Sequence, residues 1–359
     1  MRRAHVGWVL AAVVGCVSAD DEAAPLSPPD PVTLMTLNAA SGAGDTFRTT
    51  ESRVKQGAFV ARSAAEVVGL QEVDVGADRS GNLDVVASVA AAVAPGFGSC
   101  TFAVPEAPHM RRDGTRLARC EAGTLVFGVG FRADDPFSSS ADGTPGGIHD
   151  ADDSLNPRGV DRGADAFYGN AVIVRAPWEV QAAYTVALPT SASGPSLPPS
   201  VLDRLAVMDP DDDALDALAA HNATVRRGPA IEPRSALVVR VRKSSTTAVS
   251  VITTHLEASR GPMELRRAQL EAVAAIARAE QRKSAHHVVA MGDFNMPPAD
   301  VQPSLAAAGL VRAAPPEPSA DIDQMWVDPA FAIDGALRVP TENVTDHASA
   351  AQATLRALR

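Results

Sequence analysis

The segment HVVAMGDFN, residues 287–295, indicates both how the chain folds and where its polar chemistry lies. Its apolar run is typical of a buried strand, and the run ends in a carboxylate and an amide, Asp293 and Asn295. Side chains two residues apart in an extended segment point to the same side, so these two groups can act on one substrate group.

Strand-like and helix-like segments alternate on both sides of 287–295. Helices are expected at 51–65, 84–93, near 213–225 and at 263–283. The apolar residues expected on two buried helix faces are Val54, Ala58, Ala61 and Ala65, and Leu265, Ala268, Ala272 and Ile276. Further strands are expected at 32–38, 67–73, 168–175, 235–242, 248–256, 322–327 and 350–355. The first helix therefore joins two strands, and the strands at 235–242 and 248–256 are expected to be neighbours.

The composition is that of a globular protein of one or two domains. The chain has 359 residues, of which 46% are hydrophobic and 21% charged, which excludes a disordered chain or a fibrous rod. Aromatic residues are only 4%, so the core should be rich in Ala, Val and Leu. The formal net charge of −11 opposes sequence-independent wrapping of a nucleic-acid backbone.

The first residues resemble a targeting segment. An arginine pair precedes an apolar run that is too short to span a bilayer, which predicts an export signal within residues 1–19. Residues 13–16, VVGC, resemble the lipobox of bacterial lipoproteins, with Cys16 as the lipidated residue. Ordinary cleavage after Ala19 is the alternative. The protein is thus expected in the bacterial cell envelope, anchored to the membrane by lipid, or otherwise in the periplasm or secreted.

A tether separates this signal from the folded part. Residues 20–31, DDEAAPLSPPDP, are acidic and Pro-rich, as extended linkers are. Residues 32–359 are expected to form a single domain with loop insertions near 128–166 and 186–233. The aspartates of the first insertion lack the spacing of an EF-hand, which favours a solvated acidic loop over a calcium site.

The chain has three cysteines. If Cys16 is lipidated, Cys100 and Cys120 remain. An oxidising compartment favours a disulfide between them. Two buried free thiols are the alternative, because sequence does not give the Cα separation that a bridge requires.

Polar residues recur where the expected strands end. They are Asn38, Glu72, His255, Asp293, Asn295, Asp323, Asp346 and His347. Buried carboxylates are costly unless they are paired or bound to a cation, so a converging set predicts a hard metal ion. A set rich in oxygen favours magnesium or manganese over zinc. The chain contains no Walker loop, G-x-G-x-x-G or H-E-x-x-H motif, which removes several other enzyme classes.

Taken in order, the motifs LMTLN, GLQEVD, YGNAVIVR, TTHLE, MGDFN, IDQMWV and TDHA resemble the endonuclease/exonuclease/phosphatase superfamily of DNase I-like metal-dependent phosphoesterases. QEVD, DRSG (78–81) and YGNA are most similar to its small bacterial hydrolases. The resemblance implies an α/β fold: a four-layer α/β/β/α sandwich of two mixed β sheets packed face to face, with helices outside. It also implies an active site at one end of the sandwich.

The resemblance further implies a metal site and an activated water. Glu72 would be the principal metal carboxylate, with Asn38 and Asp346 holding or orienting one or two Mg²⁺ or Mn²⁺ ions. Asp293 would orient or deprotonate the attacking water, and Asn295 beside it would hold the phosphate. The physical logic is that a metal and donor side chains offset phosphoryl charge while a positioned base prepares water.

The remaining implied roles concern the phosphate. His255 and His347 would contact its nonbridging oxygens, and Asp323 would orient the imidazole of His347. Three further residues are candidates either for phosphate or substrate contacts or for structural roles in turns: Arg79, Asn170 and Arg234.

The function expected from these observations is metal-dependent hydrolysis of a P–O ester bond by activated water. The net negative charge, and the lack of a basic stretch interleaved with aromatics, favour a small, lipid or sugar phosphoester over nucleic acid. An extracellular nuclease of the same superfamily is the alternative within this class. From another class, a catalytically silent lipoprotein that serves as a binding platform would be expected to have lost a chemical residue, and every motif position here is competent. The sequence gives no indication of a protein partner.

Overall fold

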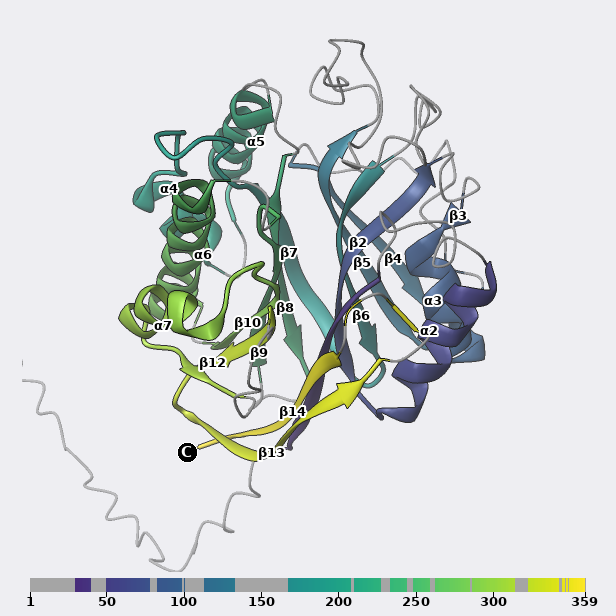
Figure 1. Cartoon of the computed structure of the whole chain (residues 1–359). Coiled ribbons are helices and arrows are strands. Elements are labelled where there is room, and N and C mark those ends of the chain that lie inside the picture. The colour runs from purple at the N-terminus through teal and green to yellow at the C-terminus, as the bar shows by residue number, and fades with distance from the viewer. Residues whose placement is uncertain are drawn as a thin grey trace, which may run out of the picture.

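The structure, a computed structural model, describes residues 30–39, 50–77, 83–98, 100, 113–132, 167–207, 210–226, 233–243, 248–258, 262–284, 286–313, 322–341, 344–345, 347 and 349–358. Two β sheets pack face to face, and helices cover the outer face of each (Figure 1). These layers confirm the expected α/β/β/α sandwich.

The first sheet is mixed. Its strands run in the order β13 (Phe331–Pro340), β14 (Ser349–Ala357), β1 (Val32–Asn38), β2 (Val67–Ala77), β6 (Phe167–Arg175), β5 (Gly123–Arg132) and β4 (Thr115–Cys120), with β3 (Leu83–Asp84) paired to β2. Strands β1 and β2 are parallel, as the helix between them allows, and their other neighbours are antiparallel. The expected strand–helix–strand unit is therefore confirmed.

The second sheet is also mixed. Its order is β11 (Val311–Arg312), β12 (Asp323–Val327), β10 (His287–Asp293), β9 (Ala248–His255), β8 (Ser235–Arg242) and β7 (Glu179–Ala187). Strands β9 and β10 are parallel, while β8 and β9 are antiparallel neighbours, as expected. Aliphatic side chains from both sheets fill the space between them, among them Val126, Val172, Val239, Val251 and Val289.

Helices form the two outer layers. Helices α2 (Thr50–Arg62) and α3 (Val85–Val93), followed by the short 3₁₀ turn η2 (Pro95–Phe97), cover the first sheet. Helices α4 (Pro199–Leu205), α5 (Asp212–Arg226), α6 (Met263–Lys283) and α7 (Pro298–Ala307) cover the second (Figure 1). Helix α5 confirms the helix expected near 213–225.

The buried face of α2 differs from the expected one. Val54 is 52% exposed, so its placement on the buried face was wrong. The face that is buried centres on Gly57, where an added Cβ would come within 2.3 Å of Val89 O and 2.4 Å of Ala92 Cβ in α3. Close packing of the two helices at this glycine rotates α2 and buries the polar Arg53 and Gln56.

The buried face of α6 is also rotated from the expected one. Ala268 and Ala272 are only partly buried, whereas Gln269, Leu270 and Val273 are buried. Leu265 and Ile276 are buried as expected.

Some expected segments fall partly or wholly outside the described residues. The signal with Cys16, and the tether up to residue 29, lie outside them, as do residues 133–166 of the first insertion. Residues 128–132 of that insertion continue strand β5. In the part of the chain that is described, no helix is long and apolar enough to cross a membrane.

Cys100 and Cys120 form a disulfide, with 5.9 Å between their Cα atoms. This is the pairing expected from the sequence. The bridge ties the segment that follows η2 to the end of β4.

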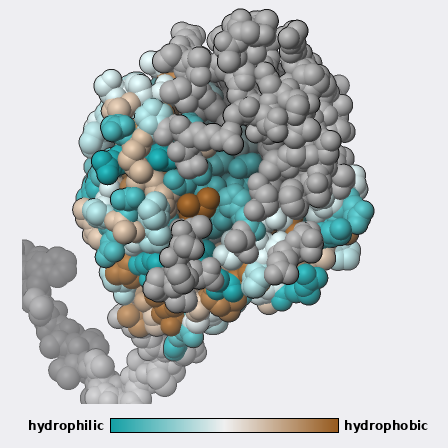
Figure 2. Space-filling model, in the orientation of Figure 1, coloured by the Kyte–Doolittle hydropathy of each residue, from teal (hydrophilic) through white to brown (hydrophobic). Residues whose placement is uncertain are grey.

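The face shown in Figure 2 carries hydrophilic residues beside a hydrophobic one at its centre, and it is more hydrophobic at its lower left. The lower end carries the edge strand β13 and the C-terminus (Figure 1). Ile333, Leu337 and Leu358 are the large exposed hydrophobic residues there.

Candidate active site

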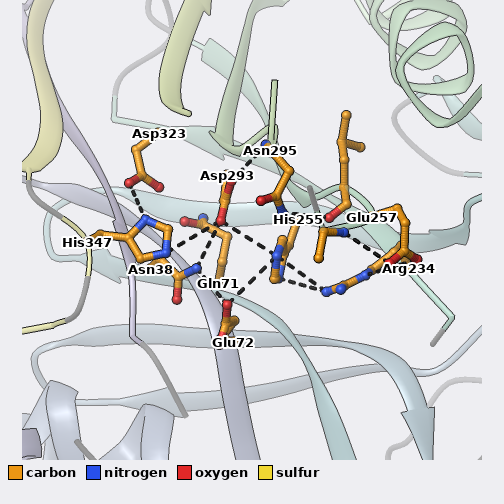
Figure 3. Close-up of polar contacts among 12 residues, drawn as sticks. Asn38, Gln71, Glu72, Arg234, His255, Glu257, Asp293, Asn295, Asp323 and His347 are labelled. Atoms are coloured by element: carbon orange, nitrogen blue, oxygen red, sulfur yellow. Dashed lines mark hydrogen bonds and ion pairs between the residues drawn. The ribbon is translucent and has the colours of Figure 1, made fainter. Parts of the chain in front are cut away.

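Four polar residues meet because their strands end together. Asn38 is the last residue of β1, His255 the last of β9 and Asp293 the last of β10. In the second sheet, Asp293 is in register with His255 on one side and with Asp323, the first residue of β12, on the other. The close-up in Figure 3 shows these side chains pointing toward one another from the two sheets.

Glu72 reaches this group from an irregularity in β2. The pairing of β2 with β6 shifts register between Leu70 and Val73, and Glu72 has a left-handed backbone with φ of 53°. Such a conformation costs about 1–3 kcal/mol for a residue other than glycine and is concentrated at functional sites. The irregularity turns the Glu72 side chain toward Asn38, whose Nδ2 donates to Glu72 Oε1 at 2.9 Å.

The amide of Asn38 links carboxylates from the two sheets. Its Nδ2 also donates to Asp293 Oδ2 at 3.1 Å, and the Asn38 side chain is fully buried. This geometry supports a role in orienting both carboxylates.

Asp293 is buried, and its backbone surroundings are fixed tightly. Burial and the nearby Asp323 raise the pKa of Asp293 to about 7. The backbone N–H of Asn295 donates to Asp293 Oδ1 at 2.8 Å, and Asn295 Nδ2 donates to Leu256 O at 3.0 Å. Asp293 Oδ2 is therefore the oxygen directed toward the other polar side chains.

His347 is held by a carboxylate. Its Nδ1 lies 2.6 Å from Asp323 Oδ2, and its Nε2 lies 3.6 Å from Asp293 Oδ2. Burial works against the charged imidazolium, but Asp323, Asp293 and Glu72 outweigh it and raise the pKa of His347 to about 10.

His255 is held by a guanidinium instead. Nη1 of the buried Arg234 lies 3.0 Å from His255 Nδ1, and because a guanidinium only donates, that ring nitrogen accepts. Nε2 lies 3.6 Å from Asp293 Oδ2 and 3.4 Å from the same Arg234 Nη1. Burial and the positive charge of Arg234 hold the pKa of His255 well below its usual range.

The residues fit a divalent cation. Glu72, Asp293 and His347 each offer an atom within 4.8 Å of the others, and the two carboxylates are the members that fit a cation, because Asp323 favours the charged form of His347. Two of these are carboxylates from opposing sheets, and a hard cation bound between them would offset the cost of burying their charge. The oxygen-rich donor set agrees with the expected preference for magnesium or manganese.

The structure thus brings together seven of the expected residues, which are Asn38, Glu72, His255, Asp293, Asn295, Asp323 and His347. Asn170 is buried, and its Nδ2 donates to the carbonyl oxygen of Ser235 at 2.9 Å. Ser235 directly follows Arg234, so this contact links Asn170 to the backbone beside Arg234. Arg79 and Asp346 lie outside the described residues.

Sequence reasoning missed some residues that support the site. Gln71 donates from Nε2 to Thr253 Oγ1 at 2.8 Å and accepts from Thr36 Oγ1 at 3.1 Å, which links the two sheets. Glu257, with Oε2 4.0 Å from Arg234 Nε, was also missed. Both residues are polar and stand in or beside an apolar strand. Because a buried polar group requires partners, this pattern could have identified them.

Two sheets packed face to face, with carboxylates and imidazoles gathered at one end, are the arrangement of DNase I-like hydrolases, which cleave phosphoesters with a divalent metal. The model of the Endonuclease/Exonuclease/phosphatase family matches residues 35–347, and the chain belongs to this family. It is accordingly a metal-dependent hydrolase of phosphoesters. No curated protein sequence matches the chain significantly.

Solved structures share the fold at low identity. An endonuclease/exonuclease/phosphatase from Beutenbergia cavernae DSM 12333 has a TM-score of 0.52 and 18% identity, covering 91% of this chain and 72% of that one. A family protein from Bacteroides thetaiotaomicron has a TM-score of 0.53 and 13% identity, covering 92% and 98%. The mannosyl-6-phosphatase of Bacteroides thetaiotaomicron VPI-5482 has a TM-score of 0.51 and 13% identity, covering 90% and 99%.

Proposed function

We propose that this protein hydrolyses a P–O ester bond of a small, lipid or sugar phosphoester, with Mg²⁺ or Mn²⁺ bound at Glu72. The observation that carries the proposal is the pair of carboxylates held by Asn38, with two imidazoles beside them. Asn38 Nδ2 lies 2.9 Å from Glu72 Oε1 and 3.1 Å from Asp293 Oδ2. This geometry combines a cation site with hydrogen-bond donors in one small space.

Metal binding in this proposal rests mainly on Glu72. Asn38 orients the carboxylates, and Asp346 is a further residue that would hold one or two ions. A bound divalent ion offsets charge on the phosphoryl group and lowers the pKa of a bound water.

Asp293 would position the attacking water. Both of its oxygens accept a hydrogen bond, Oδ1 from the N–H of Asn295 and Oδ2 from Asn38 Nδ2, and Oδ2, which faces the other polar side chains, would be the one to accept a proton from water. The Asn295 amide donates one Nδ2 hydrogen to Leu256 O and has a second for a phosphate oxygen.

The two histidines would hold the nonbridging oxygens. Nε2 of His255 and Nε2 of His347 each lie 3.6 Å from Asp293 Oδ2, so two ring nitrogens converge beside this carboxylate, where the phosphoryl group would bind. Donors fixed in advance at such a place stabilise the charge that develops in the transition state. Asp323 and Arg234 fix the two ring orientations.

Substrate preference is inferred from charge and from a similar fold. The net charge of −11 disfavours a duplex-wrapping nuclease, and the similarity to a mannosyl-6-phosphatase supports a sugar phosphate as one candidate. A nuclease of the same family remains the alternative, and salt-sensitive nicking of plasmid DNA would favour it.

Location is a separate part of the proposal. The VVGC sequence supports export and a lipid anchor at Cys16, which would hold the enzyme at a bacterial membrane. Replacing Cys16→Ser should move the protein from the membrane fraction to the soluble fraction. Retention in the membrane fraction would contradict the anchor and leave the chemistry unaffected.

The proposed chemistry is tested on the purified chain stripped of metal. A chromogenic phosphodiester, its monoester and mannose 6-phosphate are assayed with Mg²⁺, Mn²⁺ or EDTA, beside His347→Ala. Turnover that requires metal and is lost in the variant supports the proposal, and the preferred ester gives the substrate class. A folded protein that binds no divalent cation by calorimetry would instead favour the silent binding platform.

A further inference from the structure

Helix α2 buries two polar side chains that the proposed chemistry does not use. Arg53 and Gln56 have no exposed surface, although each lies on the face where an apolar residue would be expected. A buried polar group is costly unless it finds partners, so the contacts of these two residues indicate what they hold in place.

Gln56 joins two segments from opposite ends of the chain. Its Nε2 donates to Ala39 O at 2.9 Å and to Val344 O at 3.1 Å. Its Oε1 accepts from Arg53 Nη1 at 2.9 Å, and the same Nη1 donates to Ala39 O at 2.7 Å. Because Arg53 can only donate, it fixes the orientation of the amide and directs both Nε2 hydrogens at the two carbonyl groups.

These two segments carry opposite sides of the active site. Ala39 directly follows Asn38, which holds the two carboxylates. Val344 precedes His347 by three residues, and Thr341 contacts both: its carbonyl oxygen accepts from Val344 N at 2.8 Å, and its Oγ1 donates to His347 O. The buried amide of Gln56 therefore connects the segment that follows Asn38 to the segment that precedes His347.

We propose that Gln56 is a positioning residue, which holds the Asn38 and His347 segments at their working separation, with Arg53 orienting its amide. The inference rests on the proposed function, since it concerns the same reaction. The two carbonyl groups that Gln56 bonds differ in whether another side chain also donates to them. Ala39 O keeps a hydrogen bond from Arg53 if Gln56 is lost, whereas Val344 O loses the donor described here. The His347 side should therefore be released more than the Asn38 side.

The test uses Gln56→Met in the full chain, which keeps the length of the side chain and removes both donors. The matched control is Asn222→Leu in α5. Asn222 is likewise a buried amide on a helix, and its Nδ2 donates to Asp113 O at 3.0 Å and to Thr185 O at 2.7 Å. None of its hydrogen-bond partners belongs to the site, so it reports on the general effect of losing such a bridge.

Two readouts are used. In metal-free protein, hydrogen–deuterium exchange should become faster around residues 341–347 in Gln56→Met and stay unchanged there in Asn222→Leu. In the activity assay, Gln56→Met should lower kcat by about tenfold or more, because small displacements of catalytic groups are costly. In an Asp323→Asn background, where His347 has lost its carboxylate partner, it should lower kcat by less than about threefold, because coupled residues are not additive.

Three results would overturn the inference: unchanged exchange around 341–347, an equal loss of kcat in both backgrounds, or an equal loss of kcat in Asn222→Leu at matched stability. If Gln56→Met does not fold, Gln56→Glu replaces it, since Glu keeps the bond from Arg53 but presents oxygen to both carbonyl groups. It should give the same faster exchange. A native chain without phosphoesterase activity would refute the proposed function, while the exchange result in metal-free protein would still decide the role of Gln56.

Discussion

His347 Nδ1 lies 2.6 Å from Asp323 Oδ2. His347 stands just before β14 of the first sheet, whereas Asp323 is the first residue of β12 in the second sheet, so a carboxylate of one sheet orients an imidazole that belongs to the other. This carboxylate fixes the ring and favours its charged form. The imidazole is thereby held with Nε2 toward Asp293.

Asp323→Asn should lower kcat by about a hundredfold or more with little change in KM, because an amide of the same shape cannot hold the same protonated ring. Steady-state kinetics on the preferred ester measures this. Asp334→Asn, which alters an exposed pair with Arg356, is the control and should leave kcat unchanged. A rise in KM with unaltered kcat would show that Asp323 serves substrate binding alone.

Glu72→Gln should weaken Mn²⁺ binding by about tenfold or more, because the neutral amide removes the principal anionic ligand of a hard cation. Calorimetry on the metal-stripped protein measures the affinity. Added Mn²⁺ should restore part of the activity in this variant but none in His347→Ala. The control Glu66→Gln alters a carboxylate that accepts from Thr33 N near the start of β1 and should bind Mn²⁺ normally. Unchanged affinity in Glu72→Gln would place the cation elsewhere.

Most of the site could be predicted because it lies at strand ends. Asn38, His255 and Asp293 each close an apolar run, and parallel strands bring such ends to the same edge of a sheet. The single-residue shift that turns Glu72 toward this edge could not be derived from periodicity, since it depends on how β2 pairs with β6. Glu72 was expected among the polar residues at strand ends, but it lies inside β2, and its role as the principal metal carboxylate came from the family resemblance.

Residues that support the site from a distance were harder to predict. Val54 was placed on the buried face of α2 by its hydrophobicity, but close approach of α3 at Gly57 decides which face is buried. Arg53 and Gln56 are therefore identified only in three dimensions. Strand β13 was not expected because its sequence does not alternate between apolar and polar residues. It lies at the edge of the first sheet, and its apolar residues Ile333 and Leu337 are exposed.

Gly292→Ala should lower the free energy of unfolding by more than about 2 kcal/mol. Gly292 has φ of 142°, and an added Cβ would lie 2.0 Å from Thr254 O in the neighbouring strand. Urea denaturation measures the loss. Gly335→Ala is the matched control, since a Cβ there meets nothing within 4 Å, and it should change stability little. Equal stability of the two variants would mean that β9 and β10 do not approach as described.

Glu280→Ala should lower the free energy of unfolding by about 3–5 kcal/mol, because it leaves a buried guanidinium without its counter-charge. Arg240 and Glu280 are both 0% exposed, and Arg240 Nη2 lies 2.7 Å from Glu280 Oε1. The same carboxylate accepts from Tyr184 Oη at 2.7 Å and from Ser250 Oγ at 2.7 Å. The substitution therefore also removes the acceptor of these two buried hydroxyl groups. Urea denaturation measures the loss, and Asp334→Ala, which breaks only the exposed pair with Arg356, is the control. A larger loss in Glu280→Ala shows that burial of the pair, and not charge pairing alone, causes the destabilisation. A similarly small effect of both substitutions would show that water reaches the Glu280 cluster.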